Sequence, residues 1–219
     1  MKHMRDTLFW NTVTPLLKTT LSKLMDSGIF DQFRLVGGTS LSLQLGHRTS
    51  VDIDLFTGAN YGSINFSAID NFLRESFPYV SEPQAGVIGM GRSYLVGEDK
   101  NETVKLDLYY TDAFMQPALV IGSYRLATIE EIIAMKIDIV QRGGRKKDFW
   151  DLHELLDQYS PSQMIELHKI RYPYNHEETE IRSNFINFTT ADDDFDPICL
   201  KGKYWELIKL DTIQALQKA

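Results

Sequence analysis

Two carboxylates stand out because they lie two residues apart in a segment that alternates apolar and acidic residues. The segment runs from Val51 to Phe56, and its acidic residues are Asp52 and Asp54. In a strand, side chains two residues apart leave the same face, roughly 7 Å from each other. Carboxylates placed in this way can hold one or two divalent cations, as phosphoryl transfer requires. The alternative is the solvent-exposed face of an ordinary strand.

A glycine pair lies upstream of these carboxylates. Gly37 and Gly38 precede Thr39, between an apolar run that predicts a strand over 33–36 and a pattern that predicts a short helix over 39–45. Glycines let the backbone approach a phosphate closely, and N–H groups at a helix start attract anions. The Thr39 hydroxyl could add a hydrogen bond. The alternative is a strand-to-helix turn that needs glycine only for its dihedral angles.

A third carboxylate could complete the site. The stretch Lys105-Leu106-Asp107-Leu108 alternates, which indicates a strand in which Asp107 faces opposite to its apolar neighbours. If this strand pairs near residues 51–56, Asp107 joins Asp52 and Asp54. Otherwise Asp107 is a polar residue on the face of an edge strand.

The elements that must position these residues follow from hydrophobic periodicity. Helical spacing predicts helices over 6–25, 39–45 and 64–76, and short apolar or alternating runs predict strands over 33–36, 51–56, 87–95, 103–110 and 119–121. From Thr128 onward the period is helical, with helices expected over 129–140, 148–159, from 160 and over 204–218. The order predicts an α+β fold: a mixed sheet flanked by helices in a domain of residues 1–125, then a helical domain of residues 126–219.

Composition limits the classes of protein. The chain has 219 residues, 43% of them hydrophobic, and a net charge of -7. This acidity excludes a general nucleic-acid coat protein, because neutralising phosphates requires Lys and Arg, so any nucleic-acid contact must be local. Cys199 is the one cysteine, and there is neither a signal-peptide core nor an apolar run of membrane-spanning length. We therefore expect a cytoplasmic protein with no membrane partner.

The motifs together resemble a known family. Gly-Gly-Thr, then Asp-x-Asp, then a third Asp on a later strand resembles the nucleotidyltransferase superfamily built on the DNA polymerase β palm. More narrowly, GGTSLSLQLGHRTSVDIDLF is similar to the AbiEii/AbiGii toxin family of nucleotidyltransferases. A second stretch, AMK followed by RGGRKKDFWDL, is similar to that family's Lys…Arg-Gly…Lys-Asp-Phe-x-Asp-Leu segment. The resemblance covers about residues 33–156, which is more than half of the chain.

The resemblance implies a nucleotidyltransferase-type fold and a role for each matching residue. Gly37, Gly38 and Thr39 would hold the nucleoside triphosphate, with Thr standing where the superfamily often has Ser. Asp52 and Asp54 would bind Mg²⁺ or Mn²⁺. Asp107 would bind metal or help to deprotonate the attacking hydroxyl. Lys136 would contact the phosphates of the nucleotide, and Asp148 would be a polar active-site partner or a base.

The residues of the second half allow structural interpretations as well. Lys136 could extend its ammonium to solvent from an otherwise apolar helix, and Asp148 could simply cap the start of the next helix. Arg48 is a further candidate for phosphate contact. The basic cluster Arg142, Arg145, Lys146 and Lys147 is either a solvated loop or a landing site for nucleotide or tRNA.

Three functions follow from this. The first is an enzyme that moves a nucleoside monophosphate from a nucleoside triphosphate to a hydroxyl of tRNA or protein; by resemblance it is the toxin of a bacterial toxin–antitoxin or phage-defence system, with a cognate antitoxin. The second has the same chemistry with a small, aminoglycoside-like acceptor, which the acidic balance favours. The third is a non-catalytic nucleotide-binding protein of the same fold.

Overall fold

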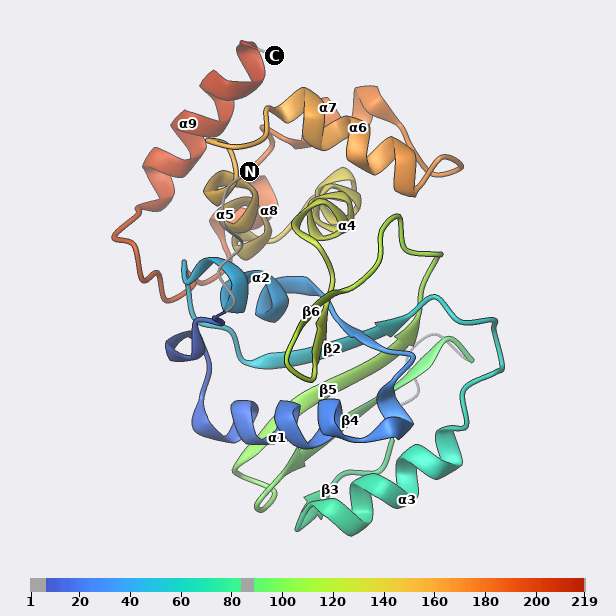
Figure 1. The fold of residues 1–219 in the computed structure, drawn as a ribbon. Helices are drawn as coiled ribbons and strands as arrows, with labels where there is room; N and C mark the ends of the chain where they lie inside the picture. The colour runs from blue at the N-terminus through green and yellow to red at the C-terminus, as the bar shows by residue number, and fades with distance from the viewer. Residues whose placement is uncertain (1–6, 84–88, 219) are drawn as a thin grey trace. The chain divides into compact units, whose positions relative to one another are not determined.

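The computed structural model describes residues 7–83 and 89–218, which form two compact units (Figure 1). The first, here called the sheet unit, contains the residues up to Gln44 and Ser50–Ala127. The second, the helical unit, contains Leu45–Thr49 and the residues from Thr128 onward. The boundary expected after residue 125 lies two residues from this division, whereas the transfer of Leu45–Thr49 to the helical unit was not expected.

The sheet unit is built on a seven-stranded mixed sheet in the order β3-β4-β5-β2-β1-β7-β6. β2 pairs in parallel with β5 and antiparallel with β1, and β1 pairs in parallel with β7. The strands are β1 Arg34–Leu35, β2 Asp52–Thr57, β3 Tyr79–Val80, β4 Gly91–Gly97, β5 Thr103–Tyr110, β6 Leu119–Ile121 and β7 Tyr124–Leu126.

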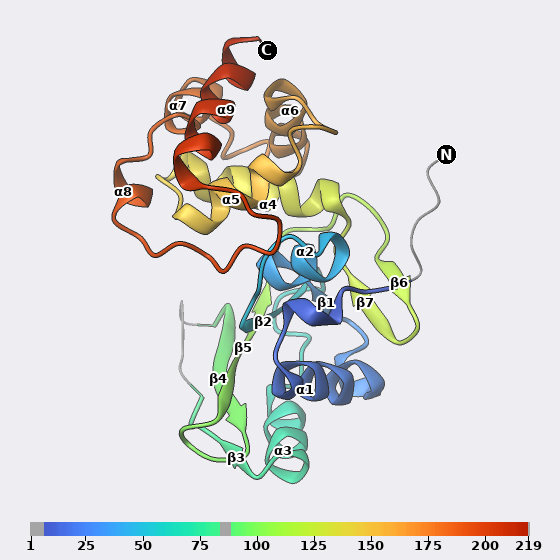
Figure 2. The ribbon, with the colours of Figure 1, turned by 90° about the vertical axis from the view of Figure 1, so that its left-hand side faces the viewer.

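Helices cover one face of this sheet. The helices of the unit are α1 Pro15–Asp26, α2 Gly37–Leu45 and α3 Phe66–Ser76, with 3-10 turns at η1 Trp10–Thr12 and η2 Gly28–Phe30. Thr14 caps α1 by accepting the N–H of Leu17, and Pro15 supplies a favourable first residue. Figure 2 shows α1 and α3 on one side of β4 and β5. The core lies there, because the apolar residues of β2 and β5 pack with those of α1 and α3. Alternation sends the acidic residues of β2 and β5 to the other face.

The helical unit contains α4 Ile129–Gln141, α5 Lys146–Glu154, α6 Pro161–Arg171, α7 Glu178–Asn184, α8 Thr189–Asp192 and α9 Trp205–Gln217. α6 begins where expected, with Ser160 and Gln163 forming a capping box. Trp150 and Trp205 stack with their rings 6.4 Å apart in its core. No helix in the described ranges is long and apolar enough to cross a membrane.

Several predicted boundaries were wrong. α2 begins at Gly37 and includes both glycines, whereas they were expected to precede it. The strand expected over 87–95 runs over Gly91–Gly97, and residues 87 and 88 lie outside the described residues. β7 was not predicted. α5 begins at Lys146 and not at Asp148, because Asp148 is its third residue and accepts the N–H of Arg145 at 3.0 Å.

Candidate active site

The pairing of β2 with β5 brings the three predicted carboxylates to one face of the sheet unit. Asp54 lies in register with Asp107, and Asp52 with Lys105. The three aspartates are partly exposed, whereas the residues that alternate with them, such as Ile53, are buried. In-register neighbours point to the same face, so two carboxylates lie side by side on adjacent strands about 4.8 Å apart.

Lys105 is a member of this cluster that the sequence analysis did not assign. Its Nζ donates to Oδ2 of Asp107 at 2.5 Å. This hydrogen bond raises the pKa of Lys105 against the opposing effect of desolvation, and the charges of Asp107, Asp54 and Asp52 raise it further. The other oxygen of Asp107, Oδ1, is buried and has no hydrogen-bond partner among the described residues. The cluster therefore already attracts one cationic group.

Gly37 joins the glycine turn to the carboxylates. Its φ is +65°, and a Cβ built on it would lie 2.8 Å from Oδ2 of Asp54. Any other residue would be strained and would also collide with this carboxylate. The preceding N–H, that of Val36, donates to the backbone carbonyl of Asp54 at 2.9 Å. The N-terminus of α2 is thus held directly beside Asp54.

Thr39 has a different position from the one that phosphate binding by its hydroxyl would require. The side chain is 1% exposed. Its hydroxyl lies 2.8 Å from Oγ of Ser50 and donates to the backbone carbonyl of Asp52. Thr39 therefore fixes α2 against the start of β2. The hydroxyl of Thr39 is therefore engaged within the sheet unit, in contrast to the predicted phosphate contact.

The carboxylates have the chemistry of a magnesium site but not its closed arrangement. Among the residues that the structure describes, no three His, Cys, Asp or Glu side chains are grouped so as to hold a metal ion. Asp107 is instead directed to Lys105. Three carboxylates on one face, with an unpartnered buried oxygen on Asp107, are hard oxygen donors of the kind that Mg²⁺ takes. The residues therefore fit a divalent cation once Asp107 leaves Lys105.

The candidates of the helical unit converge on Asp151. Arg48 binds it through two hydrogen bonds, Nε to Oδ1 at 2.6 Å and Nη2 to Oδ2 at 2.8 Å. His47 Nε2 lies 2.8 Å from Oδ1. Lys136 Nζ lies 2.8 Å from Oδ2 of Asp151 and 2.5 Å from Oδ1 of Asp148. All five side chains are at least 95% buried.

Opposite charges inside this network stabilise one another. Burial acts to raise the pKa of Asp151, but Lys136 and Arg48 outweigh it and hold the pKa well below its usual range. Burial acts to lower the pKa of Lys136, but Asp151 and Asp148 keep it raised. Lys136 and Arg48, both predicted to contact phosphates, thus have buried carboxylate partners. The signal for Asp151 was its spacing of three from Asp148, which places both on one helix face.

The basic cluster is largely matched by acidic residues of the same unit. Arg142 pairs with Asp138 at 2.6 Å. Arg145 pairs with Asp194 at 3.1 Å, and Lys146 with Asp196 at 2.9 Å. These last two acids lie in the segment that follows α8. The cluster is therefore a set of ion pairs and less positive than its sequence suggests.

Comparisons with known proteins identify the fold and the family. The chain is 29% identical over 142 residues to the uncharacterized protein aq_aa25 of Aquifex aeolicus, a match that covers 64% of this chain and 65% of that relative. Its fold is similar to that of a candidate nucleotidyltransferase from H. pylori, with a TM-score of 0.59, 20% identity, and 92% of this chain and 90% of that chain covered. It is also similar to MenT4, a nucleotidyltransferase toxin of Mycobacterium tuberculosis, with a TM-score of 0.54, 15% identity, and 93% and 83% covered.

These two structural matches support the nucleotidyltransferase fold that the sequence predicted. The family is shown by a separate match. The family described as "Nucleotidyl transferase AbiEii toxin, Type IV TA system" matches residues 19–198, which include the glycine turn, the three carboxylates and the network around Asp151. The chain belongs to the AbiEii nucleotidyltransferase toxin family.

Proposed function

We propose that the sheet unit transfers a nucleoside monophosphate from a nucleoside triphosphate to a hydroxyl acceptor and releases pyrophosphate. The observation that carries the proposal is the β2–β5 register. It sets Asp54 beside Asp107, while Gly37 holds the N-terminus of α2 against Asp54. Carboxylates for a cation and backbone N–H groups for an anion thus lie next to each other, which is what binding a metal–triphosphate requires.

Each candidate residue of the sheet unit has a role in this proposal. Asp52, Asp54 and Asp107 would hold Mg²⁺ or Mn²⁺, which supplies positive charge to the phosphates when bound. The N–H groups at the start of α2 would bind phosphate oxygens, with Gly37 leaving room for them. Thr39 would act as a positioning residue through Ser50 and the Asp52 carbonyl. Asp107, freed from Lys105, could also accept the proton of the attacking hydroxyl.

A contribution of the helical unit to the site stays a prediction. Because Lys136, Asp148 and Arg48 are buried and paired, we propose that they act by fixing segments of the helical unit to one another and not as open phosphate ligands. Replacing Lys136 with Met tests this. The proposal expects lost stability at unchanged nucleotide affinity, whereas a direct phosphate contact requires weaker nucleotide binding by a variant that still folds.

Membership of the family extends the proposal to the biological role of the protein. We propose that the chain is a toxin, that a cognate antitoxin restrains it, and that its acceptor is tRNA or a protein. What supports this is the family match and not any acceptor surface, since the basic cluster is largely paired. The net charge of -7 favours a cationic small molecule as the second candidate acceptor.

One transfer assay tests the reaction and separates the acceptors. Each of the four α-labelled nucleoside triphosphates is incubated with the protein, Mg²⁺ and, in separate arms, total tRNA, total protein and an aminoglycoside. We expect label transfer and pyrophosphate release in one arm, both lost in Asp54→Asn and retained in Glu82→Gln, which alters an 88% exposed carboxylate of the same unit. Equal transfer by Asp54→Asn would contradict the proposal.

A further inference from the structure

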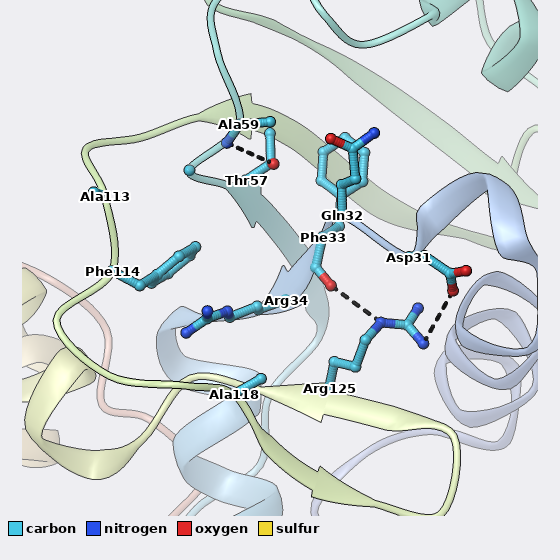
Figure 3. Close-up of a pocket in the computed structure, with 11 residues that line it drawn as sticks. Asp31, Gln32, Phe33, Arg34, Thr57, Ala59, Ala113, Phe114, Ala118 and Arg125 are labelled. Carbon is cyan, nitrogen blue, oxygen red and sulfur yellow. Dashed lines mark hydrogen bonds and ion pairs between the residues drawn. The ribbon is translucent and has the colours of Figure 1, made fainter.

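A pocket of about 430 Å³ lies in the sheet unit, apart from the three carboxylates (Figure 3). Its walls include Arg34 at the start of β1, Thr57 at the end of β2, Phe114 in the loop after β5, and Arg125 on β7. We call it the Arg34 pocket. Its volume lies within the range of about 300–1,000 Å³ that is typical of small-molecule sites.

The sheet register relates this pocket to the carboxylates. Arg34 lies opposite Phe56 in the β1–β2 ladder, and Phe56 follows Asp54 by two residues on the same face. Directly opposed residues of an antiparallel pair also share a face. Arg34 therefore rises from the carboxylate-bearing face, about 7 Å along β2 from Asp54.

The walls offer a flat cationic surface. Cζ of Arg34 lies over the ring of Phe114, 4.0 Å from its centre, and Figure 3 shows both groups facing the pocket. A hydrogen bond of 2.6 Å from Arg34 to the backbone carbonyl of Gln116 fixes the guanidinium plane. Guanidinium planes and aromatic rings are the groups on which proteins stack nucleobases.

The charge around the pocket favours an anion. The lining residues include two basic side chains, Arg34 and Arg125, and one acidic one, Asp31, which pairs with Arg125 at 3.6 Å. Arg125 also donates to backbone carbonyls, so Arg34 is the basic side chain that faces a ligand. Such a positive surface is local in a chain with a net charge of -7. Small residues, Gly58, Ala59, Ala113 and Ala118, form much of the remaining wall and leave the space open.

We infer that the Arg34 pocket binds a nucleotide, with the base against the Arg34–Phe114 pair and a phosphate toward the positive charge of Arg34. The inference rests on the proposed function for its ligand class, since the nearby carboxylates would act on nucleotides. The nucleotide could belong to the incoming triphosphate or to the end of an RNA acceptor. Both sources present the same base and phosphate.

Binding of nucleoside monophosphates in EDTA tests the pocket without the metal site. The four monophosphates are titrated into the full chain and followed by ligand-observed NMR. We expect saturable binding that Phe114→Ala weakens about tenfold, the effect of losing one stacked base contact. Ala113→Trp, which fills the pocket from an exposed position, should weaken it as much, and Arg74→Lys, a surface arginine of the same unit, should leave it unchanged.

Thermal melting of each variant establishes that it is folded. Absence of monophosphate binding by the wild type, or equal binding by Ala113→Trp, would overturn the inference. Asp54→Asn should bind monophosphates in EDTA like the wild type, so failure of the pocket and failure of the proposed transfer reaction give different results.

The source of the nucleotide is settled with the same variant. A nucleoside triphosphate and a single-stranded RNA trinucleotide are each titrated into wild type and Ala113→Trp. Selective loss of the triphosphate identifies the incoming substrate as the ligand, and selective loss of the RNA identifies the acceptor. Retention of both would contradict a nucleotide pocket.

Discussion

Two lysine–carboxylate pairs with the same 2.5 Å distance lie in the two units, Lys105–Asp107 in the sheet unit and Lys136–Asp148 in the helical unit. Lys105 is 48% exposed and Asp107 15%, whereas Lys136 and Asp148 are 5% and 3% exposed. A partly solvated pair contributes little and can open to admit another cation. A buried pair cannot lose one partner without leaving an uncompensated charge. We therefore propose different roles for the two pairs: the exposed pair opens to a cation, whereas the buried pair fixes the helices of its unit.

The largest expected effect is on catalysis by Asp107. Asp107→Asn should lower nucleotide transfer about a thousandfold, which corresponds to roughly 4 kcal/mol of lost transition-state stabilisation. The melting temperature should stay the same or rise, because the substitution removes one of two like charges in register, those of Asp54 and Asp107. Single-turnover kinetics and thermal melting measure the two effects. If Asp107→Asn stays active or is markedly less stable than the wild type, the proposed difference between the two lysine–carboxylate pairs is wrong.

The opposite result is expected at Asp151. Asp151→Ala leaves Lys136 and Arg48 buried without their shared partner, and the free energy of unfolding should fall by about 3–5 kcal/mol. Urea unfolding followed by tryptophan fluorescence measures this, since Trp150 and Trp205 lie in the same unit. The control is Glu178→Ala, which removes an exposed ion pair with Arg182 and should leave stability nearly unchanged. Equal free energies of unfolding for the two variants would contradict a structural role for the network around Asp151.

The pH dependence of stability sharpens the same point. The pKa of Asp151 is lowered in the folded protein, so its contribution is present above its unfolded pKa of about 4 and is lost as the pH falls from there through the lowered value. The pKa of Lys136 is raised, so its contribution is lost only as the pH rises above about 10. Asp151→Asn should therefore flatten the decrease in unfolding free energy on the acid side. Urea titrations from neutral pH to pH 3 measure this. If wild type and Asp151→Asn lose the same unfolding free energy over this range, Asp151 is not the group responsible.

The smallest expected effect concerns Lys105. Lys105→Gln removes the positive charge that holds Asp107, and Mn²⁺ affinity should rise about fivefold, the equivalent of roughly 1 kcal/mol for a partly exposed pair. Lys100→Gln changes an exposed lysine in the adjoining turn and serves as the control. Weaker Mn²⁺ binding by Lys105→Gln would show that Lys105 supports the cation site and does not compete with it.

Much of the fold could be predicted because alternation and helical period are local properties. β5 was predicted at its observed bounds, and the shared face of Asp52 and Asp54 follows from strand geometry alone. β7 was missed because an arginine separates its two apolar residues, whereas β6, which is equally short, is an unbroken apolar run. The start of α5 was misplaced because Asp148 accepts the N–H of Arg145 from the third helical position, whereas a first-turn acidic residue suggested the cap itself.

The electrostatic partners could not be predicted from local patterns. The ion pair of Lys105 with Asp107 depends on rotamers within one strand, and the location of both beside Asp54 depends on a pairing of distant segments. Asp151 receives hydrogen bonds from His47 and Arg48, which precede it by more than 100 residues. Only the fold makes such residues neighbours, so Lys136 and Arg48 could not be distinguished from open phosphate ligands by sequence.

Cation binding by the sheet face tests the central claim most directly. Mn²⁺ is titrated into the full chain, and free Mn²⁺ is followed by electron paramagnetic resonance in wild type, Asp54→Asn and the control Glu82→Gln. Saturable binding by the wild type and Glu82→Gln, lost in Asp54→Asn at an unchanged melting temperature, is the predicted result. Equal binding by Asp54→Asn, or no binding by the wild type, would contradict a catalytic metal site on β2 and β5.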